Sequence, residues 1–584
     1  MDKVNIKING IAMAVAPGTT VLQAAHDAGV DIPTLCYMKE INEIGACRIC
    51  MVEVSEGGRP AKLVASCVYP VSEGMEVFTS TAKVMKARKV TLELILSNHN
   101  MQCLTCKRNQ NCELQTLAQK YGIETVRFKH DTFEENIDNT TGVIVRDNSK
   151  CILCRRCVAA CKKRQDVAVI GATQRGFDTE IGCAFEMKLD SVPCVSCGQC
   201  IVACPTGALH ERNQVDDVID AIGDDSKHVV IAIAPSIRVH MGEFFGMPIG
   251  TNTHGKIATA LKMMGFDGVF DVDTAADITI MEEGTELLHR LQNGGPLPLI
   301  TSCSPGWIKF AEYYYPEMIE NISSCKSPQG MYGSLMKTYY AEKQGIDPKD
   351  MVVVSVMPCT AKKFEAGRED LRVNGLDPID ISLTSRELAE LIKRMGINFT
   401  ELEDSEFDPI FGIASGAGHI FGVTGGVMEA ALRTVAEIVN KKPLEKLEFE
   451  EVRGFDDIKE ATIKLEGVDV NVAVTSGLAN ARKLLDMVKN GEKQYHFVEI
   501  MACPGGCVNG GGQPIQPTSI TNFTDIREAR AKGLYDFDAE LPLRKSHENP
   551  VVKEIYDTYL EAPGSEKAHH ILHTTYAEKT RYNR

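Results

Sequence analysis

Two runs of four cysteines in the middle of the chain have the spacing that binds iron–sulfur cubes. Each run follows the pattern Cys-x2-Cys-x2-Cys-x3-Cys, and Pro205 directly follows the second run. At this spacing the fourth thiolate of each run crosses to the cube that the other run holds. Two such runs in tandem predict a two-cluster ferredoxin module and argue against buried free thiols, disulfides or a single zinc site. The predicted ligands are Cys151, Cys154, Cys157, Cys161, Cys194, Cys197, Cys200 and Cys204.

Four further cysteines lie among glycines and short strand-like segments near the N-terminus. One ligand, a close pair and a distant fourth ligand suit a 2Fe–2S cluster held in a loop of a β-grasp fold. Zinc remains the alternative, because four thiolates are also a structural zinc set. Iron is favoured because the downstream clusters need redox partners. The predicted ligands are Cys36, Cys47, Cys50 and Cys67.

A third ligand set combines one histidine with three cysteines. A histidine one helical turn before a Cys-x2-Cys pair can complete a four-ligand set. Because imidazole is neutral, its use in place of a thiolate removes a negative charge from the cluster and is expected to raise the reduction potential. A lone histidine here would be read as a surface residue, but with three cysteines in register a ligand is favoured. The predicted ligands are His99, Cys103, Cys106 and Cys112.

The elements that must position these ligands change in character along the chain. Residues 1–80 begin with alternating apolar residues around Asn9-Gly10, which predicts a hairpin followed by an amphipathic helix. From about residue 223, β-branched apolar runs alternate with helical stretches, as in an α/β domain with parallel strands covered on both faces. Ligand sites of such folds lie at the carboxyl ends of the strands. Four cysteines lie at or just after predicted strand ends, namely Cys303, Cys359, Cys503 and Cys507.

The composition excludes several classes of function. The chain has 63 Lys and Arg residues against 79 Asp and Glu residues, a formal charge of −16, which disfavours nucleic acid as a partner. No apolar run is long enough to predict a transmembrane helix, and the N-terminal segment does not resemble a signal peptide. Many cysteines at metal-ligand spacings imply a reducing compartment, so we expect a cytoplasmic protein. Cys183 falls outside every pattern and is predicted to be a buried or spare thiol.

Three segments resemble the signature motifs of the iron-only (FeFe) hydrogenases. They are TSCSPGW at residues 301–307, MPCTAKKFE at 357–365 and EIMACPGGCVNGGGQP at 499–514. The resemblance covers essentially the whole chain, including the order of the four accessory cluster sites, and is greatest to the clostridial type of architecture.

The resemblance implies an α+β multidomain protein with a large α/β catalytic domain. The expected divisions are a β-grasp 2Fe–2S domain at residues 1–80, a 4Fe–4S domain with one histidine and three cysteine ligands at 81–125, a two-4Fe–4S ferredoxin domain at 126–222, the catalytic domain at 223–545 and a segment similar to the family's small subunit at 546–584.

The resemblance also assigns roles around the active centre of the family. This centre, the H-cluster, is a 4Fe–4S cube joined through one cysteine to a two-iron unit that carries CO, cyanide and a bridging azadithiolate. Cys359 and Cys503 match cube ligands, Cys507 matches the bridging cysteine, and Lys362 matches the lysine that hydrogen-bonds one cyanide. The loop that cradles the other cyanide with backbone and hydroxyl donors is matched by Ala234, Pro235 and Ser236. The lining of the di-iron pocket is matched by Gln329, Met357, Phe421 and Met501.

A proton relay is implied in the same way. Heterolytic splitting of H2 releases a proton that must leave through groups spaced for hydrogen-bonded transfer. Glu283 and Glu286 are three residues apart in a predicted helix and share one face; without the resemblance, a solvated acidic helix end would be the preferred interpretation. The residues that match the family's relay are Cys303, which faces the azadithiolate amine, and then Glu283, Ser323, Glu286 and Arg290.

One position departs from the family pattern. Ser304 stands where most members have a cysteine that is the fourth cube ligand. A serine hydroxyl is a much poorer ligand than a thiolate in a sulfide cube. Cys325 replaces a residue that is usually alanine in the clostridial proteins, which suggests that Cys325 supplies the missing thiolate. Weak ligation by Ser304 is the alternative.

These matches predict an enzyme for the reversible reaction 2H+ + 2e− ⇌ H2, with electrons relayed through one 2Fe–2S and three accessory 4Fe–4S clusters. In having Ser304 and Cys325 at these two positions, the chain resembles catalytic subunits of NAD-linked, electron-bifurcating hydrogenases. This resemblance implies ferredoxin and flavin- and NAD(H)-binding subunits as partners. The chain has no glycine-rich nucleotide fingerprint of its own.

The alternatives are a hydrogen sensor, a stand-alone ferredoxin hydrogenase and a non-catalytic iron–sulfur carrier or assembly protein. The presence of Cys303 and Cys507 disfavours the sensor and the carrier. Catalytic bias, oxygen tolerance and cluster potentials depend on geometry that spacing does not determine.

Overall fold

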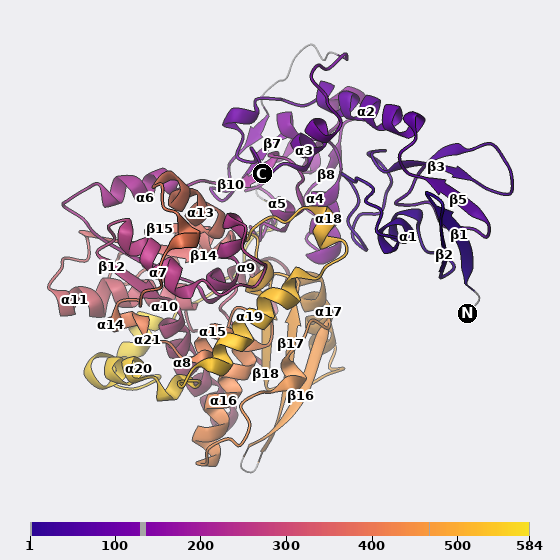
Figure 1. The fold of residues 1–584 in the computed structure, drawn as a ribbon. Helices are drawn as coiled ribbons and strands as arrows, with labels where there is room; N and C mark the ends of the chain where they lie inside the picture. The colour runs from indigo at the N-terminus through magenta and orange to yellow at the C-terminus, as the bar shows by residue number, and fades with distance from the viewer. Residues whose placement is uncertain (1–2, 129–135, 466–467, 583–584) are drawn as a thin grey trace.

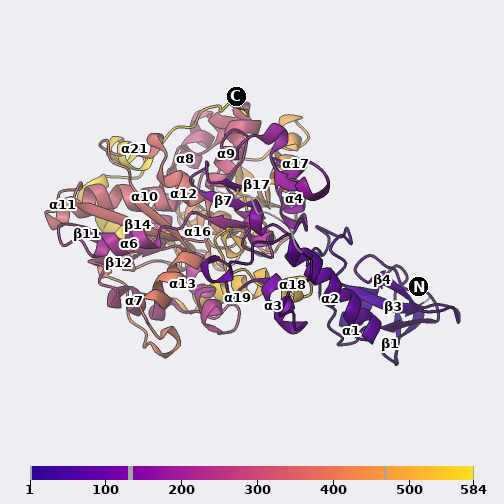
Figure 2. The ribbon, with the colours of Figure 1, turned by 90° about the horizontal axis from the view of Figure 1, so that it is seen from above.

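In the computed structural model, which describes residues 3–128, 136–465 and 468–582, the N-terminal part is a five-stranded sheet in the order β2-β1-β5-β3-β4. Asn9 and Gly10 both have positive φ, so the predicted turn closes an antiparallel β1–β2 hairpin. This sheet projects from one side of the molecule (Figures 1 and 2). The elements are β1 (Val4–Ile8), β2 (Ile11–Val15), α1 (Val21–Asp27), β3 (Met51–Ser55), β4 (Lys62–Ala65) and β5 (Met75–Phe78).

Short elements and long loops connect this sheet to the rest of the chain. Such an arrangement suits cluster ligands, since loops can wrap a cube from several sides. The helices are α2 (Ala82–Ser97), α3 (Glu113–Lys120), α4 (Arg156–Ala159), α5 (Gln199–Ala203) and α6 (Val215–Ile222). The strands are β6 (Ile137–Asp138), β7 (Ile144–Asp147) and β10 (Leu209–Glu211), which form one sheet, and the pair β8 (Gly171–Thr173) and β9 (Glu180–Gly182).

Two four-stranded sheets form the core of the large C-terminal region. The first, in the order β12-β11-β14-β15, is parallel throughout, as the apolar strand sequences predict. The second, in the order β13-β18-β17-β16, ends in an antiparallel β16–β17 hairpin that the sequence pattern did not reveal. The strands are β11 (His228–Ile233), β12 (Gly268–Asp271), β13 (Leu299–Ile300), β14 (Met351–Met357), β15 (Ile381–Thr384), β16 (Ile458–Leu465), β17 (Val468–Ser476) and β18 (Phe497–Met501).

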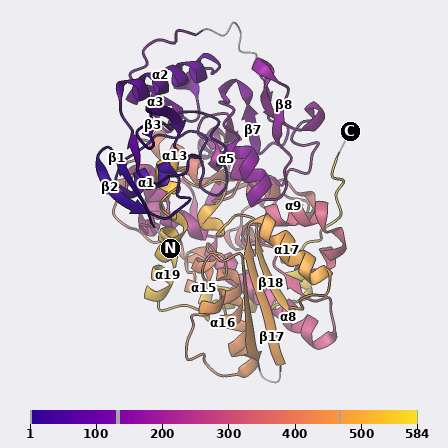
Figure 3. The same cartoon turned by 90° about the vertical axis from the view of Figure 1, so that its right-hand side faces the viewer.

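Helices cover both faces of the second sheet, because successive strand residues point to opposite sides. Val472 and Val474 pack with α8 and α16, whereas Ala473 packs with α9 and α17 on the other face; Figure 3 shows β17 and β18 between α16 and α17. The helical stretches that the sequence predicts between the apolar runs include α13 and α16. The helices of this region are α7 (His254–Met263), α8 (Asp273–Asn293), α9 (Pro305–Tyr314), α10 (Pro328–Leu335), α11 (Ala341–Gln344), α12 (Ala361–Ala366), α13 (Ser385–Arg394), α14 (Pro409–Gly412), α15 (Gly416–Ile420), α16 (Gly426–Asn440), α17 (Leu478–Lys489), α18 (Thr518–Thr521) and α19 (Ile526–Glu540).

The last part of the chain returns to the catalytic region. It contains α20 (Pro550–Ile555) and α21 (Glu566–Leu572), shown in yellow in Figure 1. The backbone N–H of Lys326 donates to Leu572 O at 2.8 Å, and that of Thr574 donates to Ser324 O at 2.7 Å. The loop that carries Cys325 is therefore bound to the C-terminal segment. None of the described helices has the length and apolar character needed to span a bilayer.

Candidate active site

The ligand sets predicted for the ferredoxin module lie together in space. All 21 cysteines are free. One cavity is lined by the first three cysteines of the first run together with Cys204, and a second cavity by the first three cysteines of the second run together with Cys161. The fourth cysteine of each run thus crosses to the other site, as the spacing predicts. The two groups are Cys151, Cys154, Cys157 and Cys204, and then Cys161, Cys194, Cys197 and Cys200.

The two N-terminal ligand sets are also compatible with clusters. Cys50 Sγ and Cys67 Sγ are 3.3 Å apart, and the backbone N of Cys47 is 3.5 Å from Cys36 Sγ. The charges of Cys36 and Cys47 are among the causes that raise the pKa of Cys67, so the two pairs lie near each other. In the histidine set, His99 is buried and its Nδ1 has no hydrogen-bond partner among the described residues. A buried ring nitrogen without a partner is costly, and a metal ligand bond would satisfy it.

One buried cavity unites the three hydrogenase-like motifs. It lies at the carboxyl ends of β13, β14 and β18, where the strand-end cysteines were predicted to meet. Cys303, Ser304, Cys359, Cys503 and Cys507 all line it. The other predicted residues that line it are Ala234, Pro235, Gln329, Met357, Lys362, Phe421 and Met501.

Two of the residues predicted to contact the H-cluster, Ser236 and Cys325, do not line the cavity. Ser236 is buried behind the cavity wall, where its Oγ donates to Cys507 O at 3.4 Å, so its hydroxyl supports the backbone of the third motif. Cys325 is fully buried and lies beside Glu286, with its Sγ 3.9 Å from Glu286 Oε2. It does not line the cavity, whereas Ser304 does. The structure therefore places Ser304, and not Cys325, at the cavity wall, and the C-terminal segment binds the Cys325 loop away from it.

This placement has a direct consequence for iron content. We expect Cys325→Ala to contain as much iron per chain as the unmodified protein, because no cluster cavity includes this thiol. Iron and sulfide analysis of the two purified proteins, together with the EPR signal of the cube, measures this. Loss of about four iron atoms per chain, the content of one cube, would restore Cys325 as a ligand.

Lys362 is held by a hydrogen-bonded group that the sequence pattern did not reveal. Its Nζ donates to Ser327 Oγ at 2.7 Å and to Glu365 Oε2 at 2.8 Å. Gln329 Nε2 donates to the same carboxylate oxygen at 2.9 Å. The one signal in the sequence was the spacing of Lys362 and Glu365, three residues apart on α12.

A buried ion-pair network supports the walls of the cavity and was also missed. Arg238 is fully buried and its Nη2 lies 3.0 Å from Asp271 Oδ1 and 2.9 Å from Asp273 Oδ2. His419 contacts Asp273 and lies two residues before the cavity residue Phe421. The network joins the loop after β11 to the start of α8 and to α15, so it fixes three segments that surround the cavity.

The predicted relay residues lie in sequence behind Cys303, with Glu283 and Ser323 buried and Glu286 and Arg290 half-buried. The backbone N–H of Ser302 donates to Glu283 Oε1 at 3.4 Å, and Ser323 Oγ donates to Glu286 Oε2 at 2.8 Å. Arg290 Nη2 donates to Glu286 Oε1 at 2.6 Å at the outer end. Both glutamates lie on α8, as predicted.

Burial determines the protonation of this chain. Desolvation, aided by the charge of Glu286, raises the pKa of Glu283 to about 8. Desolvation and the charge of Glu283 also raise the pKa of the Cys303 thiol well above its usual value. Cys303 is therefore a neutral thiol at neutral pH, and Glu283 can both hold and release a proton there.

Models of known protein families match five segments of the chain. Residues 227–511 match the C-terminal domain of the iron-only hydrogenase large subunit, and residues 524–579 match the iron hydrogenase small subunit. Residues 1–82 match a 2Fe–2S iron–sulfur cluster binding domain, residues 88–127 the iron–sulfur binding region of NADH-ubiquinone oxidoreductase-G, and residues 150–208 a 4Fe–4S dicluster domain.

Full-length relatives are similar over the entire chain. The chain is 45% identical to the NADP-reducing hydrogenase subunit HndD of Solidesulfovibrio fructosivorans, with all of both chains covered. It is 44% identical to iron hydrogenase 1 of Clostridium pasteurianum, covering 98% of this chain and 99% of the relative. The structure of a variant of apo [FeFe]-hydrogenase HydA1 from Chlamydomonas reinhardtii matches with a TM-score of 0.57 and 44% identity, covering 63% of this chain and 100% of that one. This protein belongs to the iron-only (FeFe) hydrogenase family.

Proposed function

We propose that this hydrogenase interconverts protons and H2 at an H-cluster that Cys359, Cys503 and Cys507 hold in the buried cavity. The observation that carries the proposal is that this cavity has three cysteines and Lys362 on its walls and Cys303 at the start of an acid chain. A bound H-cluster supplies the metal at which H2 is formed or split. Ser304 is the remaining side chain at the fourth cube position, and its Oγ accepts a hydrogen bond from Ala502 N at 3.1 Å.

We propose that electrons reach the cavity through the ferredoxin module. The backbone of Cys197 and Gly198 contacts the third motif so closely that a Cβ on Gly511 would lie 2.2 Å from Cys197 O. Only glycine permits this approach, which supports a short path between the second ferredoxin cluster and the H-cluster.

Both N-terminal clusters connect to the outer ferredoxin cluster in this proposal. Asn42 Nδ2 bridges Cys36 O at 2.8 Å and Cys154 O at 3.0 Å, which joins the 2Fe–2S loop to the first run. Arg108 Nη1 donates to Cys204 O at 3.1 Å from the histidine–cysteine domain. Two entry points for electrons thus converge on one cluster.

We further propose that the electrons are exchanged with ferredoxin and with flavin- and NAD(P)H-binding partner subunits. The support is that a full-length relative is named as one subunit of an NADP-reducing hydrogenase. Affinity purification from the native host under anaerobic conditions tests this. Co-purifying subunits that contain flavin would support the multisubunit enzyme, whereas an active monomer that uses ferredoxin alone would reject it.

The pH dependence should be opposite in the two directions of the reaction. Below about pH 8 Glu283 carries the proton that it passes to Cys303 for H2 formation; above this pH it is ionised and can accept the proton released by H2 oxidation. We therefore expect the rate of H2 formation to fall, and that of H2 oxidation to rise, as pH increases through about 8. Initial rates with an artificial electron carrier on both sides of this pH measure both curves, and parallel curves in the two directions would contradict the role of Glu283.

The reaction itself is tested with the matured enzyme. After assembly of the H-cluster, the protein should evolve H2 from reduced ferredoxin or a reduced viologen at the rates usual for enzymes, about 1–10³ s⁻¹ or more. A fully loaded enzyme that binds H2 without turnover would instead indicate a sensor.

A further inference from the structure

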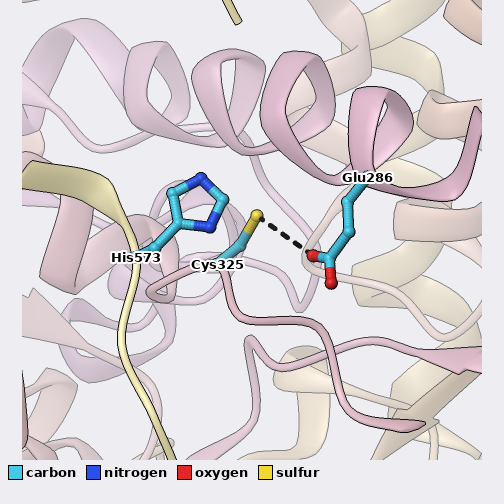
Figure 4. A group of neighbouring side chains, drawn as sticks. All are labelled: Glu286, Cys325 and His573. Atoms are coloured by element: carbon cyan, nitrogen blue, oxygen red, sulfur yellow. Dashed lines mark hydrogen bonds between the residues drawn. The ribbon is translucent and has the colours of Figure 1, made fainter. Parts of the chain in front are cut away.

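Three potential metal ligands from separate parts of the fold meet at the outer part of the acid chain. They are Glu286 on α8, Cys325 in the loop before α10, and His573 directly after α21, with one ligand atom of each within 4.8 Å of the others. In Figure 4 the thiol of Cys325 lies between the imidazole and the carboxylate. We propose that these three side chains bind Zn²⁺ and that the bound ion blocks proton transfer through Glu286. The second half of this proposal rests on the relay described under the proposed function.

The donor set and its spacing suit this ion. Zinc favours thiolate, imidazole and carboxylate donors at about 2.0–2.3 Å in a tetrahedral arrangement, which places the donor atoms roughly 3.3–3.7 Å from one another. The closest pair, Cys325 Sγ and Glu286 Oε2, is 3.9 Å apart. Rotations of side chains that shorten the donor–donor distances by up to about 1.5 Å would complete three positions, and water can take the fourth.

His573 contacts a carboxylate through one ring nitrogen, as metal-binding histidines usually do. His573 Nε2 lies 3.1 Å from Glu282 Oε2, and Glu282 is itself held by Tyr556 Oη at 2.5 Å and Gly564 N at 2.9 Å. A carboxylate on one ring nitrogen orients the imidazole and makes the other nitrogen a better ligand. That other nitrogen, Nδ1, is 2.8 Å from Ser324 Oγ, which in turn lies 3.4 Å from Glu286 Oε2. The ring nitrogen that Glu282 does not hold is therefore on the side of Glu286, and a bound ion would take the place of its hydrogen bond with Ser324 Oγ.

A second histidine lies between this group of three side chains and the surface. His569 is exposed and stacks on His573 with the ring centroids 3.9 Å apart. Binding releases the thiol proton of Cys325, so zinc affinity should increase with pH. Zinc is also bound more tightly than ferrous iron by the same nitrogen, oxygen and sulfur donors.

Occupancy would interrupt the acid chain at a defined atom. Glu286 Oε2 accepts the hydrogen bond of Ser323 Oγ at 2.8 Å, while Arg290 occupies the other carboxylate oxygen. An ion bound to Oε2 would occupy the oxygen that accepts a proton from Ser323, so the proton could not be transferred to Glu286. The group of Glu286, Cys325 and His573 includes no cavity residue and no cysteine of the accessory sites. Zinc binding to this group should therefore not change the iron content of the protein.

The experiment is an anaerobic titration of the matured full-length enzyme with ZnSO4. The rate of H2 oxidation with an artificial electron acceptor is measured relative to the zinc-free rate of the same protein, and zinc K-edge X-ray absorption reports the donor atoms. We expect the unmodified enzyme to be inhibited and its zinc to have one sulfur and two or more nitrogen or oxygen donors. Cys325→Ala should need at least about 10-fold more zinc for half inhibition and show no sulfur donor, because a lost ligand costs at least as much as a lost supporting contact.

Cys183→Ala is the matched control, since this thiol is also buried but lies beside Arg146 in the ferredoxin module. It should behave as the unmodified enzyme. Equal zinc sensitivity of Cys325→Ala and the unmodified enzyme, or zinc bound without sulfur, would overturn the site. Zinc bound through sulfur with no loss of rate would leave the metal site in place and overturn the assignment of Glu286 to the relay. Iron analysis after titration shows whether any inhibition comes from cluster loss, which would also count against the proposal.

Discussion

Replacement of Cys303 by alanine should lower the rates of both H2 formation and H2 oxidation by about 10²- to 10⁴-fold, the usual contribution of a proton-transfer group. The reason is its position: Cys303 lines the cavity, and the charge of Glu283 is among the causes that raise its thiol pKa. A methyl group cannot carry a proton between the cavity and the glutamate. The cofactor itself should remain bound, because the three cysteines proposed to hold it are unchanged.

Steady-state rates in both directions distinguish a loss of proton transfer from a loss of cofactor when they are measured together with the infrared bands of the CO and cyanide groups of the proposed H-cluster. The bands should have the same intensity in Cys303→Ala and in the unmodified enzyme while the rates differ. Cys183→Ala again serves as the control for removal of a buried thiol. A Cys303→Ala enzyme that keeps more than about a tenth of the rate, well above the loss expected for a proton-transfer group, would show that protons take another route. If the bands are lost together with the rate, Cys303 contributes to cofactor binding and not to proton transfer.

The grouping of the cysteines of the two runs could be predicted from the sequence because it depends on local geometry. A cube constrains thiolates that are two or three residues apart, so the spacing of Cys151 to Cys157 and of Cys194 to Cys200 is itself the signal. The parallel strands could be predicted equally well, because a strand that is buried on both faces is a continuous apolar run, such as VVIAI in β11. The cysteines after β13, β14 and β18 then meet because parallel strands end at one edge.

The position of Cys325 could not be predicted in the same way. Its sequence neighbours include relay and cavity residues, which suggested that its thiol faces the cube. Its actual surroundings come from Glu286, 39 residues earlier, and from the bridge with His573 near the C-terminus. The direction of a loop side chain depends on such distant packing, and no spacing rule reports it. The antiparallel β16–β17 hairpin was missed for a related reason: exposed residues alternate with half-buried ones in β16, so the strand is not a continuous apolar run.

The buried ion pairs of Arg238 are a third feature that could not be predicted from the sequence. Asp271, Asp273 and Arg238 are fully buried, although charged residues are rarely buried without partners. From the sequence alone they would be placed on the surface. Their pairing across β12, α8 and the loop after β11 becomes visible only when these segments are assembled around the cavity.

Replacement of Lys362 by methionine should both abolish turnover and destabilise the protein by about 3–5 kcal/mol, because it leaves the buried carboxylate of Glu365 without its cation. Lys362 and Glu365 are both buried, and their ion pair has a distance of 2.8 Å. A loss of activity in this variant alone would therefore not distinguish a role in cofactor binding from simple unfolding.

The double variant Lys362→Met/Glu365→Gln separates the two. Glutamine keeps the shape of the carboxylate and removes its charge, so most of the lost stability should return, as it does when both partners of a buried pair become neutral. Thermal unfolding of the full chain should then have a midpoint near that of the unmodified protein, while turnover stays absent and the infrared bands of the di-iron unit are weak or shifted. Recovery of turnover in the double variant would mean that Lys362 serves only to neutralise Glu365. If the stability does not return in the double variant, Lys362 must also stabilise the cavity through Ser327, whose Oγ accepts its second hydrogen bond. The charge of Lys362 is thus tested apart from the charge that it compensates.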